Sequence, residues 1–240
     1  VAELVEKHVN INRLLELTKP VATAVVPISA GRHIYKREPS FPIAVACDPA
    51  FNFVYEANIR YLHHLGEVTY FSPLADTSLP DVGFVYLPGG YPELYLAALS
   101  ANRQMLQSIR RYVESGGKLL AECGGMMYLC DEIRDKNGDV YPMAGVLHQS
   151  ATMENMKLRL GYRTLLYNET RLKGHEFHYS RLVEQQNPLP SCAVAYTAKG
   201  VETDTPLYHY KNVWAGYTHL YWADPVGNEW FTKFVIDGNT

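Results

Sequence analysis

From residue 42 onwards, short apolar runs alternate with segments in which apolar residues recur every three to four positions. The runs predict buried strands at 43–47, 68–71, 83–87 and 118–121. The segments between them predict amphipathic helices at 55–65, 93–99 and 103–114. Such alternation favours a mainly parallel sheet with helices on both faces, and binding sites in such sheets lie at the carboxyl ends of the strands.

The pattern changes after about residue 140, where shorter aromatic and β-branched stretches follow one another. They predict antiparallel strands at 164–167, 176–179 and 193–196. A further strand at 213–217 leaves Thr218 and His219 at its end, and Asp224 and Pro225 begin a closing helix to about residue 235. The predicted fold class is α/β, a mainly parallel sheet flanked by helices, with added antiparallel strands in the C-terminal half.

The first forty residues lack this alternation. Apolar residues at helical spacing predict a helix over 5–17 that Lys19-Pro20 ends, and residues 21–41 read as a linker. We therefore divide the chain into 1–41, a helix and linker, and 42–240, one α/β domain. Because the chain begins with Val1 and not with methionine, we expect that something has been removed upstream.

Composition and charge restrict the partners, the compartment and the bound metals that we expect for the protein. A net charge of -3 gives no electrostatic basis for binding nucleic acid or an anionic membrane. No apolar run approaches the roughly 18 residues of a membrane-spanning helix. The four cysteines have neither metal-type spacing nor the density of a disulfide framework, so we expect a cytoplasmic protein without a bound metal.

The strongest chemical signal lies in residues 118–129. An apolar strand ends at Cys123, and Gly124-Gly125 open a run of helix formers. A nucleophile on such a strand-to-helix turn is held out of the sheet, and the N–H groups of the following helix lower the pKa of a thiol there. The alternative is a small buried cysteine that packs like alanine. The preceding strand and the double glycine favour the nucleophile.

Two further features suit a cysteine nucleophile. Gly89-Gly90 follow a buried strand, and their backbone N–H groups, with that of Gly124, can form an oxyanion hole. A general base is also needed, and His219 at a strand end is the best placed of nine histidines. His175 and His178 compete with it, and spacing alone leaves the three open.

Six segments, in this order and spacing, resemble the glutaminase domain of cobyrinic acid a,c-diamide synthase, a class I glutamine amidotransferase of the cobalamin-synthesis subtype. The segments are 46–55, 71–74, 87–93, 121–129, 174–180 and 217–220. The resemblance covers roughly residues 42–235 and implies a flavodoxin-like core of the class I type. It also implies that Cys123 is the nucleophile and His219 its activating base. By the same resemblance, the groups that bind the oxyanion and glutamine are Gly89, Gly90, Tyr91 and Gly124.

The chain departs from the wider pattern in two places. Tyr221 stands where the wider class I group has a glutamate that orients the histidine, so we expect a Cys–His dyad. Supporting groups to inspect are Glu176, His175 and Asp48. The full-length family enzyme also carries an N-terminal ATP-dependent synthetase domain, and no G-x-x-x-x-G-K-[ST] motif occurs in this chain. Residues 1–41 would then be the tail of that missing domain plus a linker.

The resemblance implies that the chain hydrolyses L-glutamine through a cysteine thioester. The ammonia would serve a carbon–nitrogen ligase that amidates the a and c carboxylates of cobyrinic acid in cobalamin biosynthesis. Mg-ATP would bind the synthetase domain, in the same chain or a separate one, and no cofactor is expected in this chain. Hydrogenobyrinic acid or a nickel sirohydrochlorin are alternative substrates. A peptidase on the same scaffold and a non-catalytic module that keeps the fold are the rival interpretations, and a homodimer is left open.

Overall fold

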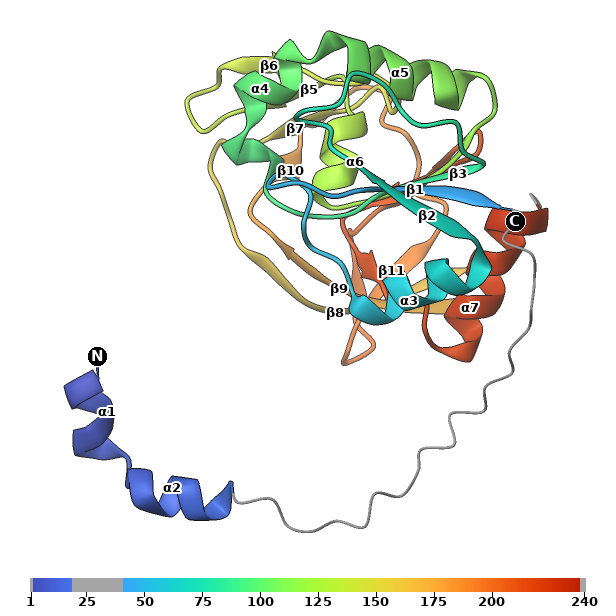
Figure 1. The fold of residues 1–240 in the computed structure, drawn as a ribbon. Helices are drawn as coiled ribbons and strands as arrows, with labels where there is room; N and C mark the ends of the chain where they lie inside the picture. Colours follow the sequence, from blue (N-terminus) through green and yellow to red (C-terminus); the bar gives the residue numbers. More distant parts are fainter. Residues whose placement is uncertain (1, 19–40, 238–240) are drawn as a thin grey trace. The chain divides into compact units, whose positions relative to one another are not determined.

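A computed structural model describes residues 2–18 and 41–237, within two compact units, Val1–Glu38 and Pro39–Thr240. The predicted linker lies outside the described residues except for Phe41, as does the predicted helix end at Lys19-Pro20. The first unit holds two short helices, α1 (Ala2–His8) and α2 (Ile11–Leu17) (Figure 1). The single helix predicted over 5–17 is wrong because Asn10 is extended and caps α2, its side chain accepting a hydrogen bond from Arg13 N at 2.9 Å. No residue of either helix is buried.

The second unit is built on a six-stranded sheet in the order β13-β14-β4-β3-β1-β2. Its strands are β1 (Pro42–Ala46), β2 (Glu67–Phe71), β3 (Phe84–Leu87), β4 (Lys118–Glu122), β13 (Leu207–Tyr210) and β14 (Val213–Gly216). Neighbouring strands are parallel except for β13, which runs antiparallel to β14 at one edge. The mainly parallel sheet is therefore confirmed.

Helices cover both faces of this sheet (Figure 1). One face packs on α4 (Leu96–Ala101), α5 (Arg103–Glu114) and α6 (Gly124–Leu129), and the other on α3 (Glu56–Leu65) and α7 (Pro225–Thr232). Alternation along β4 explains the two cores, since Leu119 and Ala121 join the first and Leu120 the second.

Two predicted helices have different bounds from those expected. The helix expected over 93–99 is a 3₁₀ turn, η1 (Pro92–Leu94), followed by α4, because Tyr95 leaves the helical conformation between them. The closing helix is capped by Asp224 as predicted, but it changes after Thr232 into a π-helical turn, Lys233–Asp237.

The C-terminal strands form two sheets of their own. A four-stranded sheet has the order β10-β7-β5-β6, from β5 (Glu132–Arg134), β6 (Val140–Pro142), β7 (Ser150–Thr152) and β10 (Arg181–Leu182). A five-stranded antiparallel sheet has the order β12-β11-β8-β9-β15, from β8 (Arg159–Tyr167), β9 (Thr170–His178), β11 (Val194–Thr197), β12 (Glu202–Thr203) and β15 (His219–Leu220). The added antiparallel strands are confirmed, although β8 and β9 pair over nine residues each and exceed the predicted stretches.

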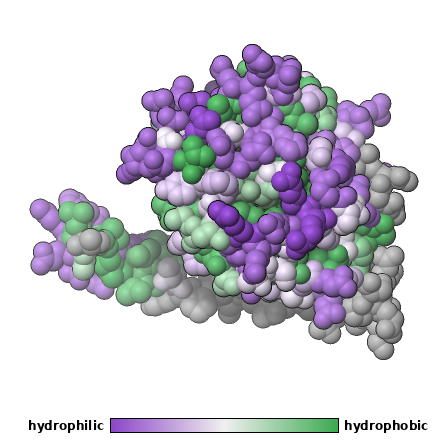
Figure 2. Space-filling model, turned by 90° about the horizontal axis from the view of Figure 1, so that it is seen from above, coloured by the Kyte–Doolittle hydropathy of each residue, from purple (hydrophilic) through white to green (hydrophobic). Residues whose placement is uncertain are grey.

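This arrangement brings the predicted site residues together at the carboxyl ends of the strands of the main sheet. Gly89 follows β3, Cys123 follows β4, and the chain leaves β14 at Gly216 to reach β15 three residues later. The face seen in Figure 2 is mainly hydrophilic, with apolar side chains in smaller patches. Among residues 2–18 and 41–237, no helix has the length and apolar character needed to cross a membrane.

Candidate active site

Cys123 forms the turn between β4 and α6. Its backbone has φ 49° and ψ −107°, a conformation that residues with a side chain rarely adopt. Two hydrogen bonds hold the turn: Cys123 N donates to Gly216 O at 2.7 Å, and Met127 N donates to Cys123 O at 3.0 Å. Backbone strain of this kind concentrates at functional sites, where the surrounding structure maintains it.

The Cys123 thiol is buried, with only 5% of the residue exposed. Burial, followed by the Glu93 carboxylate, raises the pKa of Cys123 to about 12, although the Gly124 N–H acts in the opposite direction. The expectation of an acidic thiol at the helix start is therefore wrong. The thiol is protonated at neutral pH, so a base is needed to form the nucleophile.

Cys123 and His219 line one cavity of about 260 Å³, which we call the thiol cavity. The other residues that line it are Phe53, Gly90, Tyr91, His175 and Phe177. The thiol itself contacts the backbone oxygen of Phe177 at 3.9 Å. The cavity therefore joins the candidate nucleophile, a candidate base and the glycine loop after β3 in one space.

His219 is held by packing. The residue is 3% exposed, and burial together with the neighbouring His175 and His178 lowers the pKa of His219 to about 3, so its ring is neutral at pH 7 and the same burial weakens it as a base. The Phe53 ring lies 4.4 Å away between centroids, and a Cβ on Gly89 would stand 2.2 Å from His219 Cε1. The Nδ1 atom has no hydrogen-bond partner within the described part of the chain. Ring packing thus fixes the imidazole where a carboxylate would otherwise orient it.

The two competing histidines also lie around Cys123. His175 lines the thiol cavity, its Nδ1 is 2.8 Å from Tyr55 Oη, and its ring is 5.2 Å from that of His219. His178 lies on the other side of the thiol, in a side pocket of about 20 Å³. Its Nδ1 is 2.8 Å from Ser180 O. All three histidines that the sequence left open are therefore near the thiol.

The other supporting candidates lie outside the lining of the thiol cavity. Glu176 is buried and forms an ion pair with Arg163 at 2.7 Å. Asp48 accepts hydrogen bonds from four groups in the loops after β1 and β2, namely Ala50 N, Phe51 N, Ser72 Oγ and Leu74 N. Its carboxylate organises those loops and is not directed at His219.

Two backbone donors meet beside the thiol. A Cβ on Gly124 would stand 3.3 Å from Gly90 N, so the two glycines approach closely. The Gly90 N–H donates to no other group among the described residues, and that of Gly124 faces the thiol. A side chain at Gly90 would meet Ala50 O at 2.2 Å. Tyr91 N already donates to Ala50 O at 3.0 Å, so Tyr91 presents only its ring to the cavity.

Residues 42–226 match the model of the CobB/CobQ-like glutamine amidotransferase domain. The chain belongs to this family. The hydrogenobyrinate a,c-diamide synthase of Pseudomonas aeruginosa is 40% identical over an alignment of 185 positions that covers 75% of this chain and 41% of that protein. The cobyrinate a,c-diamide synthase of Clostridium acetobutylicum is 36% identical over an alignment of 245 positions, gaps included, that covers 98% of this chain and 53% of that protein. The chain thus spans about half the length of the curated relatives it matches or less.

Solved structures agree on the fold. A glutamine amidotransferase crystal structure matches with a TM-score of 0.52 and 17% identity over 80% of this chain and 98% of that one. PurLQS from Thermotoga maritima matches with a TM-score of 0.51 and 18% identity over 75% of this chain and 87% of that one. At these identities the likeness concerns the fold alone, and it confirms the predicted class I amidotransferase architecture.

Several residues of this amidotransferase domain that line or adjoin the site were missed in the sequence. Glu93 lines the side pocket with Cys123, and burial raises its pKa. Phe53 and Phe177 form walls of the thiol cavity, and Tyr55 binds His175. Glu93 was within reach of sequence reasoning because it closes the loop that begins at Gly89-Gly90. The aromatic residues come from separate loops and strands, and no local pattern joins them.

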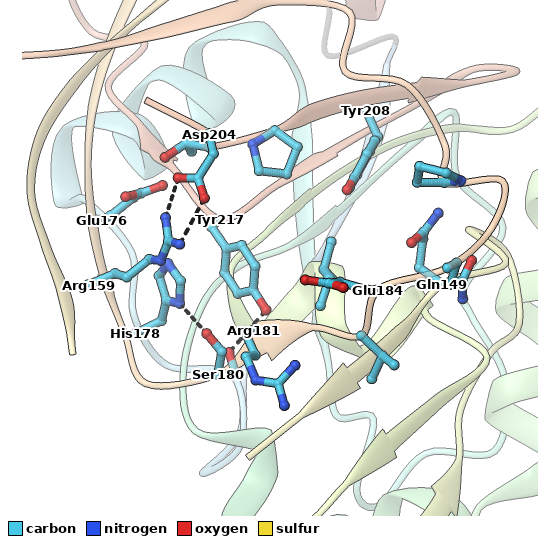
Figure 3. A pocket seen from close by; sticks show the side chains of 16 residues that line it. Gln149, Arg159, Glu176, His178, Ser180, Arg181, Glu184, Asp204, Tyr208 and Tyr217 are labelled. Carbon is cyan, nitrogen blue, oxygen red and sulfur yellow. Dashed lines mark hydrogen bonds and ion pairs between the residues drawn. The ribbon is translucent and has the colours of Figure 1, made fainter. Parts of the chain in front are cut away.

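A larger hollow of about 600 Å³, which we call the polar chamber, lies beyond His178 and Ser180 (Figure 3). These two residues also line the side pocket of Cys123, so they separate the two spaces. Ser180 Oγ is 3.2 Å from both Tyr217 Oη and Met127 Sδ. Arg159 and Asp204 also line the chamber, on the side of His178, and form an ion pair (Figure 3). No group of three histidine, cysteine, aspartate or glutamate side chains within 2–18 and 41–237 is arranged to hold a metal ion.

Proposed function

We propose that this domain hydrolyses glutamine and supplies the ammonia to an ATP-dependent a,c-diamide synthase acting on cobyrinic acid. The observation that carries the proposal is the thiol cavity, in which a strained Cys123, Gly90 and a neutral His219 share one space, with the Gly124 N–H directed at the thiol. The names of the relatives support the choice of substrate. Hydrogenobyrinic acid and a nickel sirohydrochlorin are the alternatives for the acceptor.

The chemistry follows from the protonation states of the two side chains. His219, whose ring is neutral at pH 7, takes the proton of the Cys123 thiol as the sulfur attacks the carboxamide carbon of glutamine, and the oxyanion donors must offset the cost of charging the buried ring. The N–H groups of Gly90 and Gly124 bind the oxyanion of the tetrahedral intermediate. His219 then gives the proton to the departing amine, and ammonia leaves a γ-glutamyl thioester. Water, deprotonated by His219, cleaves the thioester and releases glutamate.

Glu93 is the group that we propose for the α-ammonium of glutamine. Glu93 lines the side pocket beside the thiol, where burial raises its pKa, and no lysine or arginine among the described residues lines that pocket. An α-ammonium group supplies that missing positive charge. Substrate bound in this way would place the carboxamide toward Cys123 and the charged end toward Glu93.

The partner that we propose is a synthetase domain that binds Mg-ATP, in the same chain or as a separate one. The share of the relatives that this chain covers, 41% and 53% in the two cases above, supports a further domain. The apolar surface beside the thiol cavity supports a covering surface there, since exposed Leu160 and Tyr162 on β8 stand opposite Phe177 and His175. We further propose that residues 1–41 are the tail of that domain and that the protein acts in the cytoplasm.

Incubation of the chain with L-glutamine, followed by assay of both glutamate and ammonia, tests the proposal. We expect the two products in equal amounts, at a rate that Cys123→Ala abolishes. A slow rate is expected when residues 1–240 are assayed without the proposed synthetase domain. Equal rates for the wild type and Cys123→Ala would contradict the proposal.

A further inference from the structure

Glu122 is a buried carboxyl group directly before the candidate nucleophile. It is the last residue of β4 and only 2% exposed. Alternation along the strand turns its side chain to the face opposite Cys123, the side of Leu120 and Tyr86. A buried carboxyl group is costly unless its hydrogen bonds are made, so its partners indicate its role.

The two oxygens of Glu122 join separate parts of the fold. Oε2 is 2.7 Å from Tyr86 Oη on β3, and Oε1 accepts a hydrogen bond from Leu220 N at 3.0 Å. Leu220 directly follows His219. A single hydrogen bond therefore connects the residue before Cys123 to the residue after His219.

The hydrogen bond from Leu220 N to Glu122 lies on the edge of β15 where a neighbouring strand could otherwise pair. β15 is an edge strand, and its one partner, β9, pairs His219 with His175 and Leu220 with Gly174. On its other edge the backbone is met by side chains. Glu122 binds Leu220 N, Asn58 Nδ2 donates to Leu220 O at 2.8 Å, and Trp222 N donates to Asn58 Oδ1 at 3.0 Å. The backbone that carries His219 is thus fixed on both edges.

We propose that Glu122 is a positioning residue, which fixes the backbone of His219 relative to Cys123 and so sets the approach of the imidazole to the thiol. This role rests on the proposed function, in which Cys123 and His219 react as a pair. The role would supply the orientation that a glutamate gives elsewhere, because Tyr221 occupies the place of that glutamate and His219 Nδ1 has no partner among the described residues. Glu122 acts on the backbone of the histidine and not on its ring.

The charge state of Glu122 suits this role. Burial raises the pKa of Glu122 to about 8, so the carboxyl group is neutral at pH 7 and still accepts from Leu220 N. An ionised Glu122 would raise the pKa of the neighbouring Cys123 thiol. Glutamine at this position has the shape and neutrality of the protonated acid, whereas leucine or methionine has neither hydrogen bond.

The test measures how strongly alkylation of Cys123 depends on His219. Iodoacetamide labelling is followed on the Cys123 peptide by mass spectrometry, because the exposed Cys47 also reacts. Glu122→Gln, Glu122→Leu and Glu122→Met are each compared with and without His219→Ala, and thermal melts establish that each variant is folded. Tyr86→Phe is the matched control, since it removes the other hydrogen bond of Glu122 and keeps the bond to Leu220 N.

With His219 present, we expect Glu122→Leu and Glu122→Met to slow the labelling of Cys123 about tenfold or more. In the His219→Ala background the same changes should slow it less than about twofold, because the effects of two groups that act as a unit are not additive. Glu122→Gln and Tyr86→Phe should stay within about threefold of the wild type. The proposal would be overturned if the Glu122 changes slowed labelling equally with and without His219, or if Glu122→Gln slowed it as much as Glu122→Leu.

Labelling of Cys123 needs no glutamine. If labelling depended on Glu122 and His219 together but the protein did not hydrolyse glutamine, only the proposed function would be refuted. Full hydrolysis by a folded Glu122→Leu would refute only the positioning role.

Discussion

The thiol cavity and the polar chamber differ in the groups that they bring together. The thiol cavity, about 260 Å³, holds a strained cysteine, a neutral histidine whose Nδ1 has no partner among the described residues, and a Gly90 N–H that donates to none of them. The polar chamber, about 600 Å³, is richer in charge, but its Asp204 is paired with Arg159. His178 in its wall bonds Ser180 O through Nδ1, while its Nε2 has no hydrogen-bond partner among the described residues. Size and charge therefore point to the chamber, whereas the strained cysteine beside a histidine points to the smaller cavity as the place of chemistry.

The same contrast holds for three glutamates. Glu93 faces the thiol from the side pocket without a cation, and Glu176 is neutralised by Arg163. Glu122 is neutral by protonation and supports the backbone of β15. Two buried carboxyl groups and the half-buried Glu93 thus have different surroundings near one thiol, and their partners distinguish them.

The largest effect should separate the histidines of the two hollows. His219→Ala should lower kcat for glutamine hydrolysis by roughly a hundredfold or more, the scale of a positioned base. His178→Ala should lower it by less than about tenfold, since its ring belongs to the wall of the chamber. Steady-state rates of ammonia release measure both. A His178 variant as impaired as the His219 variant would reverse the assignment of the base.

Crowding the histidine should have the next largest effect. Gly89→Ala places a methyl group 2.2 Å from His219 Cε1, so the ring must leave its position. We expect kcat to fall by about tenfold or more, with a smaller change in KM. Gly200→Ala is the control, because its positive φ of 76° strains the backbone while nothing lies within 4 Å. If both variants lose stability alike and neither loses activity, packing against Gly89 does not hold the base.

Removing a carboxylate from the side pocket of Cys123 should change the KM for glutamine more than removing one from the polar chamber. Glu93→Gln should raise KM for glutamine by about tenfold with little change in kcat, because the α-ammonium loses its charge partner. Glu184→Gln, which changes a residue that lines only the chamber, should leave KM within about twofold. An unchanged KM in Glu93→Gln would mean that the substrate ammonium binds elsewhere.

A further effect concerns stability and pH, and not the rate of hydrolysis. The pKa of Glu122 is raised from 4.5 to about 8 in the folded protein, so folding binds a proton between these values. Stability is therefore lost as pH rises through this window, by at most about 1.4 kcal/mol per unit. Glu122→Gln has no such proton, so its stability relative to the wild type should rise from pH 5 to 8. Denaturant titrations at several pH values measure this, and a pH-independent difference would refute the neutral Glu122.

Local patterns were sufficient for the main sheet and for the position of Cys123. The apolar runs of β1, β3 and β4 lie within one or two residues of their predicted bounds, because a buried parallel strand is apolar on both faces. The turn at Cys123 followed from the strand and the glycines on either side of it. The acidity of the thiol did not follow, because burial outweighs the helix start and depends on the tertiary packing of α6 and β9.

The role of Glu122 was invisible for the same reason. Its partner Leu220 is 98 residues away in the sequence. The Glu122 side chain binds the edge of β15 that pairs with no strand, and the sequence pattern does not reveal which strands lie at the edge of a sheet. The short strands β5, β7, β10 and β15 likewise have two or three residues each, too few for a periodic signal. Cys47, expected inside a strand, is exposed directly after β1.

The thioester at Cys123 is the most direct test of the account. Wild-type protein mixed with L-glutamine, quenched in acid and digested, should yield a γ-glutamyl adduct on the Cys123 peptide by mass spectrometry. His219→Ala should form the adduct far more slowly, and Cys123→Ala should form none. Glutamate released by the wild type with no adduct at Cys123 under any quench time, or an adduct on another residue, would contradict the account.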